Sequence, residues 1–89
     1  MPSLYTVFGY KIYFWMQEGN EPIHIHVSKG KPTSNATKIW ILSNGDVKTE
    51  NKSRYPKKDI AKIENFVKAN AKYIIARWYD IFNYIKYYK

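Results

Sequence analysis

Two histidines, His24 and His26, stand one residue apart within residues 22–27, which read PIHIHV. Side chains alternate between the two faces of a β-strand, so an extended backbone here would place both imidazole rings on one face. The isoleucines and the valine of the same run would then enter the core from the opposite face. Paired imidazoles can bind a metal ion, hold an anion or transfer protons. The pair is therefore the candidate site that this sequence offers.

A metal site at this pair would need further ligands. Zinc takes four protein ligands, or three and a water molecule, and the two histidines supply only two nitrogens. Glu21, three residues before His24, is the nearest third ligand, and Glu18 and Asp46 are further candidates. The predicted metal-binding set is His24, His26 and Glu21. We expect no cofactor, with a divalent metal as the alternative.

Catalysis is a second interpretation of the pair. Either His24 or His26 could act as a general base beside a phosphodiester, with Lys29 or Lys31 stabilising the developing charge. This would make the protein a histidine-dependent nuclease, or a small metal-dependent hydrolase. The third interpretation is structural, because a buried imidazole can simply hydrogen-bond a neighbouring strand or a tyrosine hydroxyl. We favour the structural or partner-contacting role, and a binding module over an enzyme.

The charge of the chain points to an acidic partner. Lysine and arginine number 15 against seven acidic residues, which gives a formal net charge of +8. Such a balance favours contact with nucleic acid or an acidic protein, although a solvated lysine-rich surface is the plainer explanation. Only two of the cations are arginines, so sequence-specific base reading is not favoured. The candidate binding residues are Lys29, Lys31, Lys52, Arg54, Lys57 and Lys58.

The order of apolar patterns predicts one α+β domain over residues 1–89. Strands are expected at about 4–50, as runs 4–8, 10–16, 23–28, 36–42 and 47–50, and helices at about 56–86. Asn44-Gly45 is a strong hairpin signal, Pro56 suits a helix start, and Asn70 can cap a second helix. We therefore expect an antiparallel sheet of four to five N-terminal strands packed on two C-terminal helices, with residues 84–89 frayed.

Aromatic residues make up 18% of the chain, enough to fill a small core. Two helices can cover only one face of the sheet. Tyr10, Tyr13, Trp15 and Trp40 are therefore either core residues or stacking platforms on an open face, and an open aromatic face would favour a homodimer. A structural, self-associating domain is thus a third functional hypothesis.

Several classes are excluded or disfavoured by composition. The absence of cysteine rules out disulfides and thiolate metal sites. No segment approaches the ~20 apolar residues that span a bilayer, and no secretory pattern follows Met1. We expect a cytoplasmic protein without a membrane partner.

The landmarks of the chain, in their order, resemble the bacterial domain-of-unknown-function 4160 family. The matching positions are Phe8-Gly9, Ile12-Tyr13, the histidine run 22–27, Gly30, Gly45, Tyr55-Pro56 and Trp78. The chain departs from the family pattern at Ile23, which replaces a second proline, and at Gly19-Asn20-Glu21, where the family commonly has an aspartate.

The resemblance implies a bacterial protein and carries no established activity. Genes of the family often stand in small paired cassettes similar to toxin–antitoxin arrangements, which implies a protein or nucleic-acid partner. Together with the charge, this predicts a small basic binding module that contacts nucleic acid or an acidic protein as part of such a cassette.

Overall fold

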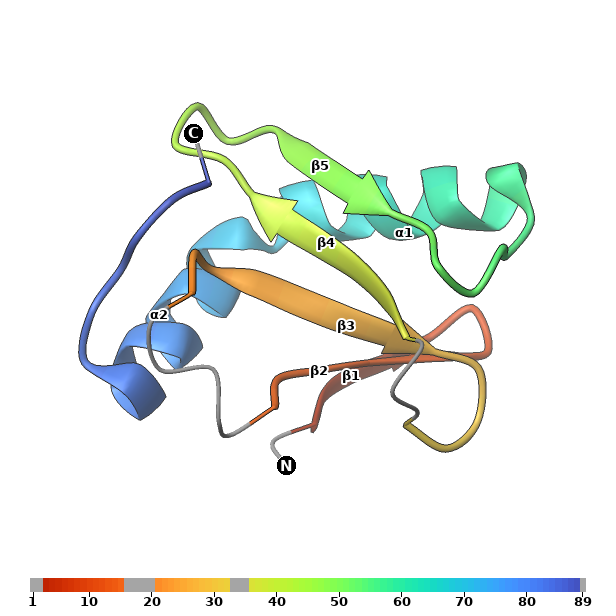
Figure 1. Cartoon of the computed structure of the whole chain (residues 1–89), viewed down its shortest axis with the longest axis horizontal. Helices are drawn as coiled ribbons and strands as arrows, with labels where there is room; N and C mark the ends of the chain where they lie inside the picture. Colours follow the sequence, from red (N-terminus) through yellow and green to blue (C-terminus); the bar gives the residue numbers. More distant parts are fainter. Residues whose placement is uncertain (1–2, 16–20, 33–35, 89) are drawn as a thin grey trace.

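A computed structural model of the chain describes residues 3–15, 21–32 and 36–88. In these residues five strands precede two helices, as predicted (Figure 1). The elements are β1 (Ser3–Val7), β2 (Tyr10–Tyr13), β3 (His24–Ser28), β4 (Thr37–Ile41), β5 (Val47–Glu50), α1 (Lys57–Ala69) and α2 (Ala71–Phe82). The strands form one antiparallel sheet in the order β1-β2-β3-β4-β5. The predicted α+β class is confirmed, and the turn predicted at Gly19-Asn20 lies outside the described residues.

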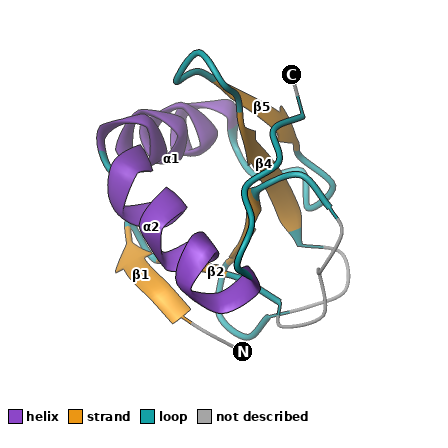
Figure 2. Cartoon of the chain, turned by 90° about the vertical axis from the view of Figure 1, so that its left-hand side faces the viewer, coloured by secondary structure: helices purple, strands orange, loops and turns teal. Residues whose placement is uncertain are grey.

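The pairing register places the apolar side chains of the central strands together on one face. Val27 of β3 lies opposite Ile12 of β2, and Ile25 lies opposite Ile39 of β4. Both helices pack on this face (Figure 2). They bury Ile60, Ile63, Val67, Ile74 and Trp78. Each large apolar side chain removed from water contributes roughly 1.5–3 kcal/mol, so this layer is the main source of stability.

The predicted break at Asn70 is confirmed, but the predicted capping role is wrong. The Asn70 side-chain nitrogen donates to the carbonyl of Phe66 at 2.9 Å, and no side-chain hydrogen bond caps α2. Asn70 therefore closes the end of α1. Its ψ of 16° differs from the extended conformation that lets an N-cap side chain reach the following backbone N–H groups.

The C-terminal end of the chain also differs from the prediction. Helix α2 ends at Phe82, because Asn83 adopts the left-handed conformation with φ of 62°. Residues 84–88, the C-terminal segment, continue along the left edge of Figure 1 toward the β4–β5 turn. The segment is fixed by a hydrogen bond from the Ile23 N–H to the Lys86 carbonyl, at 2.7 Å. It therefore packs against the sheet, where the sequence predicted a longer helix with a frayed end.

The turn between β1 and β2 holds an aromatic residue in an unfavourable conformation. Phe8 has φ of 53° and Gly9 has φ of 82°, between the paired residues Val7 and Tyr10. Two-residue hairpin turns with positive φ at both positions favour Asn-Gly, because a bulky side chain clashes there. Phe8 is nonetheless 55% exposed, so burial of its ring does not explain why a phenylalanine stands at this position.

Replacing Phe8 with asparagine is expected to stabilise the protein. Relief of the left-handed strain is worth roughly 1–2 kcal/mol, and loss of the contact with Phe66 subtracts part of it. We expect the free energy of unfolding of Phe8→Asn to rise by about 0.5–1 kcal/mol in urea titrations. Phe8→Leu, which keeps the strain, is the control and should show no gain. An asparagine variant no more stable than wild type would contradict the strain argument.

Candidate functional site

The two histidines lie side by side on β3, as the alternation predicted. Their ring centroids are 5.0 Å apart, and they share the face of β3 that lies opposite to Ile25 and Val27. Both rings are buried, since His24 is 0% exposed and His26 is 7% exposed. The imidazoles are therefore part of a second packed layer.

Aromatic side chains surround His26. The ring of Tyr13 stacks on it with centroids 5.5 Å apart, and Trp15 meets it edge-on at 6.0 Å. The Tyr13 hydroxyl lies 2.8 Å from the Ser28 hydroxyl on the neighbouring strand. Tyr13 and His26 are paired across β2 and β3, so the sheet register itself brings these rings together. This arrangement stabilises the sheet and fixes the orientation of His26.

Two tryptophans enclose His24, which is the first residue of β3. Its ring lies 5.5 Å from Trp78 of α2 and 6.4 Å from Trp40 of β4. Its Nδ1 atom lies 2.8 Å from the carbonyl oxygen of Pro22. A carbonyl oxygen only accepts, so Nδ1 carries the proton in this hydrogen bond. The bond also closes the turn that leads the chain into β3.

The C-terminal segment lies beside this layer. The Tyr84 hydroxyl donates to the carbonyl of Glu21 at 2.6 Å, and the Tyr88 ring lies 5.2 Å from Trp40. The Nζ atom of Lys48 lies 5.6 Å from the centroid of the Tyr88 ring. The C-terminal segment thus covers part of the sheet face that carries the histidines, which the sequence analysis expected to be open.

The predicted metal set of His24, His26 and Glu21 does not form a ligand cluster in this structure. No group of three or more histidine, cysteine, aspartate or glutamate side chains in the described ranges could hold a metal ion. Glu21 instead lies 3.7 Å from Lys38. Of the further candidates, Asp46 pairs with Lys68 at 3.3 Å, and Glu18 lies outside the described residues.

Catalysis by the histidines stays a prediction. The Nζ atom of Lys29 lies 5.8 Å from the centroid of Tyr10, a member of the core on the other face of the sheet from His26, so it is not placed to assist the imidazole. The burial of both imidazoles favours the structural interpretation over contact with a polymeric substrate. In this conformation the two histidines pack against tyrosine and tryptophan rings.

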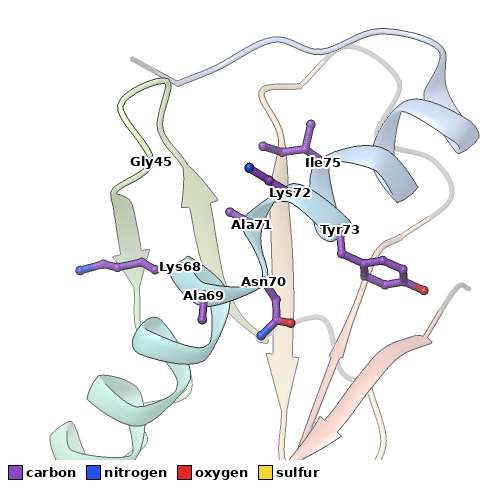
Figure 3. A pocket seen from close by; sticks show the side chains of 8 residues that line it. All are labelled: Gly45, Lys68, Ala69, Asn70, Ala71, Lys72, Tyr73 and Ile75. Atoms are coloured by element: carbon purple, nitrogen blue, oxygen red, sulfur yellow. The ribbon is translucent and has the colours of Figure 1, made fainter.

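A hollow of about 620 Å³ lies away from the histidines, between the β4–β5 turn and the junction of the two helices (Figure 3). Gly45, Lys68, Lys72 and Tyr73 contribute to its lining. The Asp46–Lys68 pair lies close to it, and the pKa of Asp46 is lowered by the Val47 N–H and then by Lys68. Sequence reasoning did not single out this hollow, because its walls come from segments with ordinary composition.

The segments that carry the six predicted basic residues lie on the same side of the molecule. Figure 1 shows that β3 and β5 both end where α1 begins, on the right-hand side, and the β1–β2 turn lies there too. All six residues are exposed. We call this group the basic end; its members are Lys29, Lys31, Lys52, Arg54, Lys57 and Lys58. The Lys29 N–H donates to the Tyr55 hydroxyl at 3.0 Å, which ties the two lysine-bearing loops together.

An inward-facing carboxylate lies beneath the basic end. The buried Tyr10 hydroxyl donates to Asp59 Oδ2 at 2.7 Å, and its ring packs edge-on against Tyr55 at 4.9 Å. Burial, and then the hydrogen bond to Asp59, raise the pKa of Tyr10 to about 12. Asp59 is not among the site residues that the sequence predicts. No local signal could show that β2 and α1 bring Asp59 and Tyr10 together.

Alkaline pH should therefore lower the free energy of unfolding, because the pKa of Tyr10 is raised in the folded protein. Its pKa of about 12 in the folded state exceeds the ordinary 10.0 of an unfolded chain. The resulting stabilisation is complete below pH 10 and is lost as the pH rises through 12. We expect the difference in free energy of unfolding between wild type and Tyr10→Phe to shrink over this interval, measured by urea titration at each pH. The other tyrosines are present in both proteins, so their contributions to the pH dependence cancel in this difference. A difference that stays constant with pH would refute the assignment to Tyr10.

Truncating His24 should cost stability. His24→Ala removes a fully buried ring and its bond to the Pro22 carbonyl, so the free energy of unfolding should fall by about 2–4 kcal/mol. His24→Asn, which can keep a donor near the position of Nδ1, should lose less. Chemical denaturation measures both variants. A loss below about 1 kcal/mol for the alanine variant would argue against a packed structural histidine.

Within the described residues, neither helix has the length and apolar character needed to cross a membrane. Searches of curated proteins and of solved structures found no match to the chain. A family model described as "Domain of unknown function (DUF4160)" matches residues 9–79. The matched stretch contains the histidine strand and Trp78, and it runs through most of α2. The chain belongs to the family of this domain of unknown function, as its sequence landmarks predicted.

Proposed function

We propose that the protein is a small nucleic-acid-binding module whose basic end contacts the phosphate backbone. One observation carries the proposal: the segments that carry six exposed cations, separated by up to 29 positions in the sequence, lie at the same end of the sheet. Clustered lysines release counterions when they bind a polyanion, and this supplies most of the affinity of non-specific binding.

The carboxylates near the basic end do little to neutralise it. Asp59 accepts a hydrogen bond from buried Tyr10 and is directed into the domain. Lys52 lies 3.5 Å from Glu50, and this is the one ion pair of the basic end among the residues that the structure describes. The remaining cations keep their charge available to a partner in solution.

The types of the cations favour backbone contact over base reading. A lysine ammonium is a mobile point charge, whereas the flat guanidinium of arginine forms paired hydrogen bonds to guanine. Arg54 is the only arginine of the basic end. Binding is therefore expected to tolerate many sequences and to weaken steeply with salt.

The setting of this activity follows from the family resemblance. A basic module in a bacterial paired cassette of the toxin–antitoxin kind would meet nucleic acid in the cytoplasm, and the cysteine-free composition fits that compartment. An acidic protein encoded beside it is the alternative partner for the same surface.

Salt titrations with matched double variants test the proposal. Fluorescence anisotropy would follow binding of labelled RNA and DNA oligonucleotides to wild type, to Lys57→Gln/Lys58→Gln, and to the control Lys72→Gln/Lys86→Gln. All four lysines are exposed, and each pair removes the same charge. We expect the first pair to lower affinity about tenfold, and to reduce the slope of log affinity against log salt by about 1.4, as for two lost contacts to a single strand.

Two results would overturn the proposal. Wild type could fail to bind either nucleic acid at low salt, or both double variants could weaken binding equally, which would reduce the effect to net charge. Tighter binding to poly-glutamate than to an oligonucleotide of equal charge would instead assign the basic end to an acidic protein.

A further inference from the structure

Four aromatic side chains form a continuous row that starts beside the basic end. The Phe8 ring, in the β1–β2 turn, lies 6.4 Å from Phe66 of α1. Tyr5 of β1 meets Phe66 edge-on at 4.8 Å and lies 5.8 Å from Tyr73 of α2. We call Phe8, Phe66, Tyr5 and Tyr73 the aromatic row. It runs from the β1–β2 turn toward α2, along the edge strand of the sheet.

The two end members of the row are the exposed ones. The Phe8 side chain is 55% exposed and that of Tyr73 is 48% exposed, whereas Tyr5 and Phe66 are half-buried. The inner pair therefore supports the outer rings, which present aromatic surface to solvent.

A cation accompanies each end of the row. Lys62 Nζ lies 6.0 Å from the centroid of Phe8. Arg77 donates a hydrogen bond to the Tyr73 hydroxyl at 3.2 Å and lies against the same ring. Aromatic rings interleaved with cations are how sequence-tolerant proteins hold single strands: the rings stack on bases, and the cations neutralise phosphates.

The β1–β2 turn requires a positive φ at position 8, but it does not require a phenylalanine there. Its positive φ would suit asparagine or glycine, and its exposed ring adds little to the core. Strain held at an exposed residue commonly accompanies a functional role, here the outward display of a ring beside Lys62.

We infer that the aromatic row is the path of a single-stranded nucleic acid, with Phe8 stacking on a base next to the basic end. The inference rests on the proposed function and narrows its ligand to single strands, because bases inside a duplex have no free face to stack on. The net charge of +8 opposes a second copy of the chain at this surface and favours a polyanion.

Phe8→Asn tests the inference, because it separates folding from binding. Relief of strain should raise the Tm, while loss of the stacking ring should weaken binding of an unstructured oligonucleotide by roughly 5- to 100-fold. Phe8→Trp should bind at least as tightly as wild type. Phe8→Leu, apolar but not aromatic, should resemble the asparagine variant. A variant both more stable and weaker in binding cannot be explained by damage to the fold.

Tyr79→Asn is the matched control. Tyr79 is 53% exposed on α2, and among the described residues no ring contact joins it to the row. Its replacement should leave affinity unchanged. An oligonucleotide carrying 2-aminopurine adds a direct readout, since stacking on an aromatic ring quenches its fluorescence in the wild-type complex and should quench it less with Phe8→Leu.

The possible failures are distinguishable. If wild type binds neither single strands nor duplexes, the proposed function fails and takes the inference with it. If Lys57→Gln/Lys58→Gln weakens binding while Phe8→Asn does not, the basic end keeps its role and the aromatic path is refuted. Equal affinity for duplex and single strand, unchanged by Phe8→Asn, would also refute the path.

Discussion

The burial of β3 on both faces is the constraint on which the rest of the structure depends. Ile25 and Val27 face the helices, and His24 and His26 face the other way, yet all four are buried. The helices cover the first face, and Trp78 of α2 also reaches the His24 ring. Other parts of the chain complete the cover of the second face. Aromatic residues of the neighbouring strands and the C-terminal segment supply this cover. The polar rings are accommodated because His24 is hydrogen-bonded to a backbone carbonyl and His26 is stacked on tyrosine.

Burial at the centre of the sheet leaves the ends of the strands as the surface that the proposed binding would use. The loops after β3 and β5 carry exposed lysines, and loops on a rigid sheet commonly carry binding residues. The Tyr10–Asp59 hydrogen bond and the Lys29–Tyr55 contact hold these loops to the sheet and to α1. The same constraint that encloses the histidines thus supports both the basic end and the adjoining aromatic row.

Predictions from the sequence succeeded where the pattern is local and failed where distant segments compete. Alternation in residues 23–28 and the Asn44-Gly45 turn indicated the strands correctly. Trp78, Phe82 and Ile85 fit one continued helical stripe, so periodicity predicts a helix that runs on to about residue 86. Left-handed Asn83 ends the helix instead, and Ile85 still packs against the core from an irregular segment. Helix periodicity could not reveal this, since both conformations bury the same side chain.

Residue types and the period of an extended chain are enough to predict the element order, the shared face of His24 and His26, and the excess of positive charge. The enclosure of these histidines, the direction of Asp59 toward Tyr10 and the aromatic row that begins at Phe8 arise only when distant elements pack together. Those outcomes depend on contacts between distant residues, such as Tyr10 with Asp59, 49 positions apart, and Phe8 with Phe66, 58 positions apart. Such contacts form through the packing of whole elements, which no local pattern encodes.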